Sequence, residues 1–192
     1  LVFLYGIIIG SFLNVCIYRL PQKENIVTTR SHCMSCGCQL KWYDLIPVFS
    51  WVALRGKCRN CGAKISVQYP LIETLNGVLY LWTFIHFGFC IESLLYCFLV
   101  SALIVLSVID FRTYEIPVGI NLFIGCLGAV RIVTDLNNWK EYAIGFFAVS
   151  VFLYLLYLIT KGRGIGGGDI KLMAAAGLLL GWKNIILAFV LG

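Results

Sequence analysis

The stretch Gly164-Ile165-Gly166-Gly167-Gly168-Asp169-Ile170-Lys171 is a glycine-rich turn set between two apolar runs. Glycine tolerates positive φ and lets another backbone approach closely, at an entropic cost. Only 12% of the residues are charged, and an acidic residue at membrane level is costly unless it has a partner or a function. A solvated interhelical loop would also use Gly and Asp, so the turn by itself leaves a structural and a functional interpretation open.

The composition around this turn is that of a membrane protein. The chain has 192 residues, 60% of them hydrophobic, and its mean hydropathy is +0.91. Because a spanning helix needs about 20 apolar residues, the pattern predicts an all-α polytopic bundle of about six to seven transmembrane helices. The candidate spans are 1–18, 71–89, 93–109, 116–133, 142–160, a short 170–181, and a run from 184 to 192. We expect both termini to be trimmed, because the chain begins without Met and ends inside an apolar run.

The distribution of Lys and Arg predicts the orientation of the bundle. Of the 15 basic residues, eight lie in 19–64, one is Arg112, and three lie in 161–171, which places twelve on one side. The opposite side has three, namely Arg131, Lys140 and Lys183. The twelve therefore face the cytoplasm, with the N-terminus outside. The net charge of +6 is explained by this asymmetry and by attraction to anionic lipid, so we expect no nucleic-acid partner.

Three regions follow from this organisation: a first transmembrane helix at 1–18, a polar cytoplasmic insert at 19–70, and a transmembrane core at 71–192. The insert contains Trp42-Tyr43-Asp44-Leu45-Ile46-Pro47 and then Ser50-Trp51. Aromatic residues near basic ones are typical of the membrane interface. We therefore expect this part of the insert to press onto the membrane.

The insert also contains two C-x-x-C pairs, Cys33 with Cys36 and Cys58 with Cys61, and each pair is followed by Gly. This pattern predicts a tetrahedral Cys₄ zinc site of structural type, because four thiolates leave no open coordination position. Two disulfides are the alternative, which a reducing cytoplasm disfavours. An insert with little apolar core needs a cross-link of this kind, here a bound metal ion, to stabilise its fold.

Polar residues also occur inside the first span and at the entrance of the second. Ser11 and Asn14 are three apart in the first span and share a helix face, where small and amide residues commonly join helices. Glu73 stands at the entrance of the second span. It is either solvated or part of a polar pocket at the cytoplasmic face.

Two acidic residues mark the cytoplasmic ends of spans. Asp110 follows a nearly unbroken apolar run, and Asp169 precedes a span of about 12 residues, which is only about 18 Å of helix. Counting the crossings places both on the same side, so they could converge at one depth. Glu115 lies nearby, but further into the connection after Asp110.

Two neighbouring carboxyls suit aspartyl-protease chemistry. They do not both ionise cheaply, so one keeps its proton while the other accepts a proton from water, and no cofactor is needed. Gly166 and Gly168 would admit an extended substrate backbone, and Lys171 would favour the ionised form of Asp169. A cation or proton path is the alternative use of intramembrane acids, but no acid lies deeper in the spans. The chain has only two histidines, His32 and His86, and it contains neither an H-E-x-x-H motif nor a Ser-His catalytic arrangement.

Taken in order, these motifs resemble the type IV prepilin peptidases, which belong to the G-x-G-D aspartyl proteases. The similarity covers nearly the whole chain, from Gly10-Ser11-Phe12-Leu13-Asn14 and Tyr18-Arg19-Leu20-Pro21 to the end of the glycine turn. It continues through the two cysteine pairs, Trp42-Tyr43-Asp44-Leu45-Ile46-Pro47, Leu54-Arg55-Gly56-Lys57-Cys58-Arg59, Tyr69-Pro70 with Glu73, Asp110 with Arg112, Thr113 and Pro117, and Gly166-Gly167-Gly168-Asp169 with Lys171. Gln68 and Val118 depart from residues that are frequent in that family.

The resemblance implies a bacterial enzyme of the cytoplasmic (inner) membrane that removes the short basic leader of type IV prepilins or pseudopilins at the cytoplasmic face. It implies that Asp110 and Asp169 are the catalytic pair. It also implies N-methylation of the new N-terminal residue with S-adenosylmethionine. Two other classes of function stay open on the residues themselves, a zinc-stapled membrane scaffold and an ion-coupled carrier, neither with protease activity.

Overall fold

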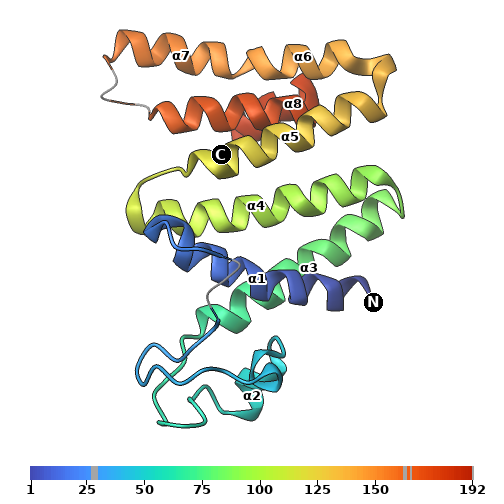
Figure 1. Cartoon of the computed structure of the whole chain (residues 1–192). Coiled ribbons are helices and arrows are strands. Elements are labelled where there is room, and N and C mark those ends of the chain that lie inside the picture. Colours follow the sequence, from blue (N-terminus) through green and yellow to red (C-terminus); the bar gives the residue numbers. More distant parts are fainter. Residues whose placement is uncertain (27–29, 162–163, 165, 192) are drawn as a thin grey trace. The chain divides into compact units, whose positions relative to one another are not determined.

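A computed structural model describes residues 1–26, 30–161, 164 and 166–191. Arg163, which the charge count includes, and Ile165 of the glycine turn lie outside these residues. The elements follow one another as α1 (Val2–Gln22), η1 (Trp42–Leu45), α2 (Phe49–Ala53), α3 (Gln68–Phe87), α4 (Ile91–Thr113), α5 (Val118–Thr134), η2 (Leu136–Asn138), α6 (Trp139–Ala148), α7 (Ser150–Ile159) and α8 (Gly167–Leu191), as Figure 1 shows. Extended pairing within these residues is limited to two isolated β-bridges in the insert, so the predicted all-α class is confirmed.

Within the described residues, four segments are long and apolar enough to cross a membrane: α1, α4, Leu136–Ile159, which includes α6 and α7, and α8. α5 is a shorter apolar helix of 17 residues. α3 has 20 residues and carries more polar groups. The helices begin and end within a few residues of the predicted spans, although α1 continues to Gln22 and α3 already begins at Gln68.

α8 is broken inside the membrane-length run. Gly181 has φ 78° and ψ 168°, which is not helical, so the helix is divided there. Glycine adopts this positive φ without the steric cost that a side chain would add. The division agrees with the two sequence-predicted apolar runs, 170–181 and the run from 184.

The chain forms two compact units, Leu1–Ile109 and Asp110–Gly192, and the boundary falls inside α4. In the N-terminal unit α1 packs closely along α3, because the glycines at their crossing have no side chains to hold the helices apart. A Cβ at Gly6 would lie 2.6 Å from the Cα of Gly77, and a Cβ at Gly10 would lie 2.7 Å from the Cα of Glu73. Small residues allow this approach between membrane helices.

A buried polar network joins three helices of the same unit. The Asn76 amide on α3 donates to the Gly6 carbonyl on α1 at 2.7 Å, and the Ser101 hydroxyl on α4 donates to the Asn76 amide oxygen at 2.9 Å. The Tyr80 hydroxyl lies 2.9 Å from the same Ser101 oxygen. Hydrogen bonds of this kind join helices where no water is present.

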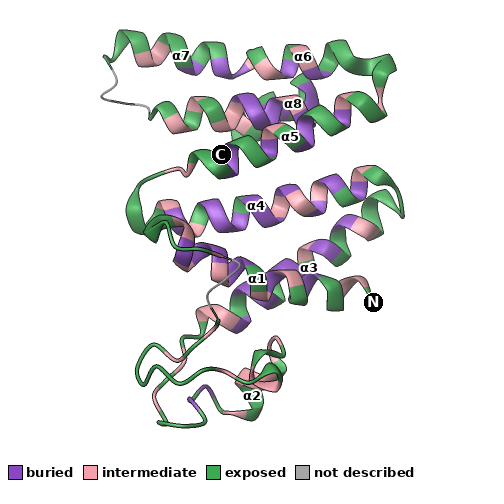
Figure 2. Cartoon of the chain, in the orientation of Figure 1, coloured by how far each residue is buried: buried purple, intermediate pink, exposed green. Residues whose placement is uncertain are grey.

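In the C-terminal unit, α8 is the central helix against which α5, α6 and α7 pack. Gly145 of α6 and Gly177 of α8 are in backbone contact, since a Cβ on either would collide with the other's carbonyl. A core cluster of Val149, Leu153, Ala176 and Ile185 lies beside this crossing. Figure 2 shows the buried residues of α5, α6 and α8 on their facing sides and exposed residues outside.

Candidate metal centre and candidate active site

The two C-x-x-C segments fold into matching knuckles. The amide of Cys33 donates to the Cys38 carbonyl at 2.9 Å, and the amide of Cys58 donates to the Ala63 carbonyl at 2.8 Å. The glycine after each pair donates to the carbonyl of the first cysteine, at 2.9 and 3.0 Å. Both glycines have positive φ, 68° and 70°. This turn requires the left-handed region, which explains why Gly follows each pair.

The knuckles bring four thiols together. The sulfurs of Cys33, Cys36, Cys58 and Cys61 all lie within 4.8 Å of one another, and those of Cys33 and Cys61 are 3.9 Å apart. Zinc bound at about 2.3 Å in a tetrahedron separates its sulfurs by about 3.8 Å. The donor set therefore fits zinc. All nine cysteines are free, so the alternative of two disulfides has no support in the structure.

The environment of the four thiols lowers one pKa and raises another. Backbone N–H groups of Cys36 and Ser35 directed at the Cys33 sulfur lower the pKa of that thiol to about 6. For Cys61, the Ala63 amide lowers the pKa, but hydrogen bonding with the neighbouring thiols and desolvation outweigh it and raise the pKa to about 11. Amides aimed at a sulfur favour a thiolate, which is the form that binds metal.

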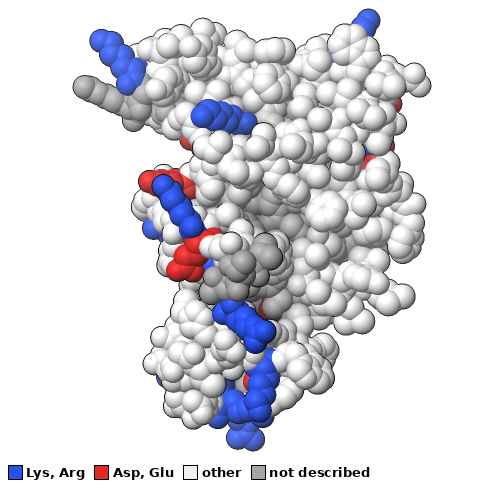
Figure 3. Space-filling view, in the orientation of Figure 1, with Lys and Arg blue, Asp and Glu red and all other residues white. Residues whose placement is uncertain are grey.

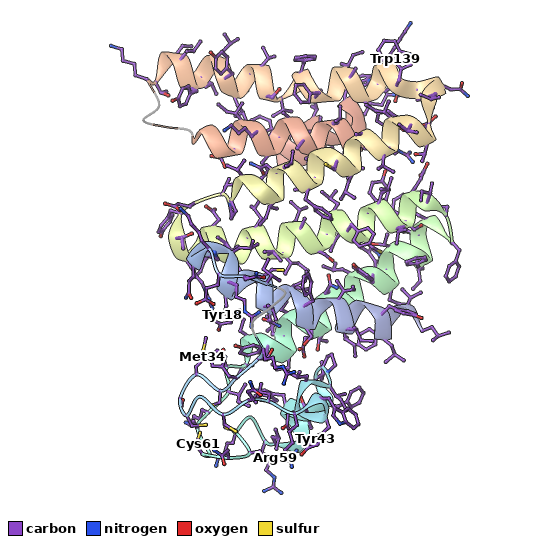
Figure 4. All side chains as sticks on the ribbon, in the orientation of Figure 1. Tyr18, Met34, Tyr43, Arg59, Cys61 and Trp139 are labelled. Carbon is purple, nitrogen blue, oxygen red and sulfur yellow. The ribbon has the colours of Figure 1, made fainter. Side chains whose placement is uncertain are left out.

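The cysteine-containing half of the insert contacts the aromatic segment. Arg59 lies between the two cysteines of its knuckle and donates to the Asp44 carboxylate at 2.8 Å, and its guanidinium carbon lies 5.0 Å from the centroid of the Tyr43 ring. Figure 4 shows Arg59 and Tyr43 on the same part of the insert, with Cys61 nearby. Asp44 is therefore an ion-pair partner that fixes η1 to the second knuckle.

Glu73 is buried, with 5% of its surface exposed, so the solvated alternative is excluded. Its carboxylate accepts the Val48 N–H of the insert at 2.7 Å. One turn before Glu73 on α3, the Tyr69 carbonyl accepts a hydrogen bond from the Asn14 amide of α1 at 3.2 Å, which agrees with the predicted role of Asn14 in joining helices. Glu73 belongs to the N-terminal unit, whereas Asp110 and Asp169 belong to the C-terminal unit.

Asp169 lies in the first turn of α8 and is exposed. Its Oδ2 accepts the Gly166 N–H at 3.2 Å, while its own N–H donates to the Gly166 carbonyl at 3.2 Å. These reciprocal bonds are those of a helix-capping turn. Lys171 follows on the helix and is exposed.

The glycine before Asp169 is held by the segment that follows Asp110. A Cβ at Gly168 would lie 2.9 Å from the Cβ of Ile116, so these residues are in close contact. The Asn121 amide on α5 donates to the Gly168 carbonyl at 3.3 Å. Asn121 is 6% exposed, and its side-chain oxygen has no hydrogen-bond partner among the described residues. The chain segments that carry the two aspartates therefore meet at Ile116 and Gly168.

Asp110 is half-buried in the last turn of α4. Its carbonyl accepts the Tyr114 N–H at 2.8 Å, and Tyr114 has φ 53°. A non-glycine residue at positive φ is uncommon and is concentrated at turns and functional sites. Glu115, the neighbouring acid, is exposed in the connection.

Sequence patterns did not single out Asn121 or Val48 as site residues. Asn121 lies in the apolar run Gly119-Ile120-Asn121-Leu122, where a lone amide in a span was the available signal. Val48 has φ 60° and ψ −53°, and the Phe49 N–H bonds to the Pro47 carbonyl across it. No pattern of residue types would predict that a valine adopts this strained turn.

Together, the fold and the two sites define a multi-helix membrane protein with a metal-fitting cysteine cluster and carboxyls at helix ends. A family model for the bacterial peptidase A24 N-terminal domain matches residues 4–87, and one for the type IV leader peptidase family matches residues 97–192. The chain belongs to the type IV leader peptidase family.

Curated relatives extend over nearly the whole chain. The prepilin leader peptidase/N-methyltransferase of Myxococcus xanthus is 36% identical over 190 residues, covering 96% of this chain and 56% of that protein. The Bacillus subtilis protein of the same name is also 36% identical over 190 residues, covering 98% of this chain and 76% of that protein. This chain therefore spans little more than half the length of the Myxococcus protein. No solved structure matches the chain.

Proposed function

We propose that this chain is a membrane aspartyl endopeptidase that removes the basic leader peptide from type IV prepilins or pseudopilins at the cytoplasmic membrane face. The relatives named prepilin leader peptidase/N-methyltransferase support the reaction and the substrate class. The observation that carries the choice of residues is the contact of Ile116 with Gly168, because it joins the segments that carry Asp110 and Asp169.

In the proposed reaction, one of the two carboxyls is ionised and accepts a proton from water, which then attacks the scissile carbonyl carbon. The other carboxyl is neutral and donates its proton to the carbonyl oxygen. During the reaction, Asp169 would give up its hydrogen bond from the Gly166 N–H and would instead bind the water or the substrate. The glycines around it leave room for an extended substrate backbone.

The test is cleavage of a prepilin peptide by purified full-length chain in vesicles. Asp110→Asn and Asp169→Asn should each lose about 10²–10⁴ in rate, the range typical of a positioned acid or base. The amide is nearly the same size, so expression and zinc content should stay near those of the parent. The double variant should be hardly slower than either single one, because residues that act as a unit are not additive.

Two acid-to-amide variants serve as controls. Glu115→Gln changes an exposed acid in the connection after Asp110. Glu73→Gln keeps an acceptor oxygen for the Val48 N–H. Both should keep measurable cleavage. If Asp110→Asn cleaved normally while Glu115→Gln did not, the wrong acid has been chosen. Normal cleavage by all four variants would mean that the chain is not an aspartyl protease, whereas absence of cleavage by the parent chain would favour a scaffold or an ion-coupled carrier.

A second activity, N-methylation of the newly exposed N-terminal residue, is proposed because the relatives' names include N-methyltransferase. S-adenosylmethionine would be the co-substrate. Transfer of a labelled methyl group to a cleaved peptide tests it separately, since a pre-cleaved peptide does not need the aspartates. Absence of label on a pre-cleaved peptide, with cleavage intact, would limit the chain to the protease.

We propose a structural role for the metal. Zinc held by Cys33, Cys36, Cys58 and Cys61 would connect the two knuckles and leave no position for a substrate. The insert is rich in basic residues, which Figure 3 shows gathered on its surface. We propose that these residues contact anionic lipid at the cytoplasmic face.

A further inference from the structure

The segment Trp42–Ala53 of the insert, which contains η1 and α2, carries an exposed apolar face. Trp42 is 78% exposed, and Phe49 and Val52 are each 61% exposed. The polar groups of the segment point elsewhere, since Asp44 pairs with Arg59 and the Trp51 indole donates to the Ile65 carbonyl at 3.2 Å. The apolar side chains are therefore unpartnered by the rest of the insert.

This apolar face lies beside α1. The two line a shared groove of about 380 Å³. Its walls are Leu4, Ile7 and Ile8 of α1 on one side and Trp42, Leu45, Ile46, Pro47 and Phe49 on the other. Leu4 and Ile8 are exposed on a helix long and apolar enough to cross a membrane. In a bilayer, such outward side chains contact acyl chains.

The position of the groove along α1 decides its depth. The first charged residue of α1 is Arg19, and Ile8 precedes it by eleven residues. At 1.5 Å per residue, Ile8 lies about 16 Å and Leu4 about 22 Å from Arg19 along the helix axis. The hydrocarbon core is about 30 Å thick. Even with a helix tilt of about 40°, Ile8 would lie about 12 Å below the level of Arg19. The groove is thus at the depth of the acyl chains and not of the headgroups.

At such a depth, backbone polar groups must be paired within the protein, and several amides of the segment are paired in this way. The amides of Ser50 and Val52 donate to the carbonyls of Ile46 and Val48 at 3.1 Å. Pro47 has no N–H, and the Phe49 N–H donates to the Pro47 carbonyl at 2.6 Å. The Val48 N–H, at the strained turn, donates to the buried Glu73 carboxylate.

We propose that Trp42–Ala53 is a re-entrant element that dips into the hydrocarbon region beside α1, with its apolar face in contact with lipid acyl chains. Glu73 anchors it by accepting the Val48 amide at membrane depth. This location is deeper than the interfacial one that the aromatic residues predict from sequence. It depends neither on which side is cytoplasmic nor on the proposed protease activity.

The test is depth-dependent fluorescence quenching of the full-length chain in vesicles of phosphatidylglycerol and phosphatidylcholine. The phosphatidylcholine carries bromine either near the headgroup or in the middle of the acyl chain. The difference between the parent and Trp42→Phe isolates the emission of Trp42. We expect a larger loss of this emission with mid-chain bromine. Trp139→Phe is the matched interfacial control, because Trp139 begins α6, and its emission should be lost mainly with bromine near the headgroup.

Each other result would overturn the proposal. Loss of Trp42 emission only with headgroup-proximal bromine would place the segment at the interface, and quenching by aqueous acrylamide alone would place it in water. Mid-chain quenching that disappears as the protein-to-lipid ratio rises would mean that a second copy covers the face.

A charge placed on the apolar face provides the second readout. Val52→Lys should expel the segment, so that acrylamide quenching of Trp42 emission increases and mid-chain quenching is lost. Met34→Lys is the control, since Met34 is also an exposed apolar residue of the insert but lies in the first knuckle. Unchanged mid-chain quenching in Val52→Lys would show that this face does not contact acyl chains.

Discussion

At the scale of single residues, Asn121 helps to position Asp169. Its amide donates to the carbonyl of the preceding glycine, Gly168, at 3.3 Å. Because Gly168 has no side chain of its own, this hydrogen bond and the contact with Ile116 restrict the turn. Asn121 is thus a positioning residue for the proposed catalytic carboxyl.

Replacing Asn121 by Leu should slow catalysis without weakening substrate binding. A lost hydrogen bond of about 0.5–1.5 kcal/mol corresponds to a decrease of up to about tenfold in kcat. KM and the thermal stability should stay near the parent values. Asn184→Leu is the matched control, because the Asn184 amide also donates to a backbone carbonyl on α8, that of Leu180. An equal kcat decrease in both variants would contradict the role of Asn121.

The metal centre gives a second comparison of neighbouring residues. Cys36→Ser should lose zinc from the purified protein, whereas Cys38→Ser should keep about one zinc per chain. Cys38 lies in the same knuckle and is exposed, but it is outside the group of four thiols. Metal analysis of both variants decides the question, and retention of zinc by Cys36→Ser would exclude the four-cysteine site.

At the scale of elements, backbone contact between helices is the feature most sensitive to substitution. Gly145→Ala would push α6 away from Gly177 of α8, and overpacking of this kind costs about 1–3 kcal/mol. Gly119→Ala is the matched control on α5, where a Cβ would meet nothing within 4 Å. It should be neutral or stabilising by up to about 1 kcal/mol. Thermal unfolding in detergent measures both, and equal stability would contradict the crossing.

Some elements could be predicted from sequence and others could not. The apolar runs determine where the long helices lie, and Gly181 marks the division of α8, because glycine is the residue that readily takes its φ. The break between α6 and α7 at Val149 has no Pro or Gly signal. It coincides with a bond from the Ser150 hydroxyl to the Phe146 carbonyl, which competes with the helix ladder.

The candidate sites also differ in how far they can be predicted from sequence. The spacing of the cysteines predicts four thiols in one cluster, because each C-x-x-C-G forms its knuckle locally. The buried bond between Glu73 and Val48 joins residues 25 apart through tertiary packing. Local patterns carry no information on it.

At the scale of the whole molecule, the charge distribution makes a prediction about topology that concerns every element. Residues 19–64 contain eight basic and two acidic residues. Exporting positive charge against an interior-negative potential costs about 2.3 kcal/mol per charge per 100 mV. Retention of the insert in the cytoplasm is therefore strongly favoured, and it determines the side of each later connection by the number of crossings.

Reporter fusions at the ends of α4 and α5 test this orientation. Fusions after Phe89 and Leu136 should give active alkaline phosphatase, which needs export, and fusions after Tyr114 and Lys161 should give fluorescent GFP, which needs the cytoplasm. The connections carrying Asp110 and Asp169 would then share the side of the insert, as leader cleavage at the cytoplasmic face requires. Active phosphatase after Tyr114 would mean that α4 has the opposite orientation and that Asp110 lies on the other side of the membrane from the insert. In that case the chain could not act on cytoplasmic leaders through this pair, however complete its motifs.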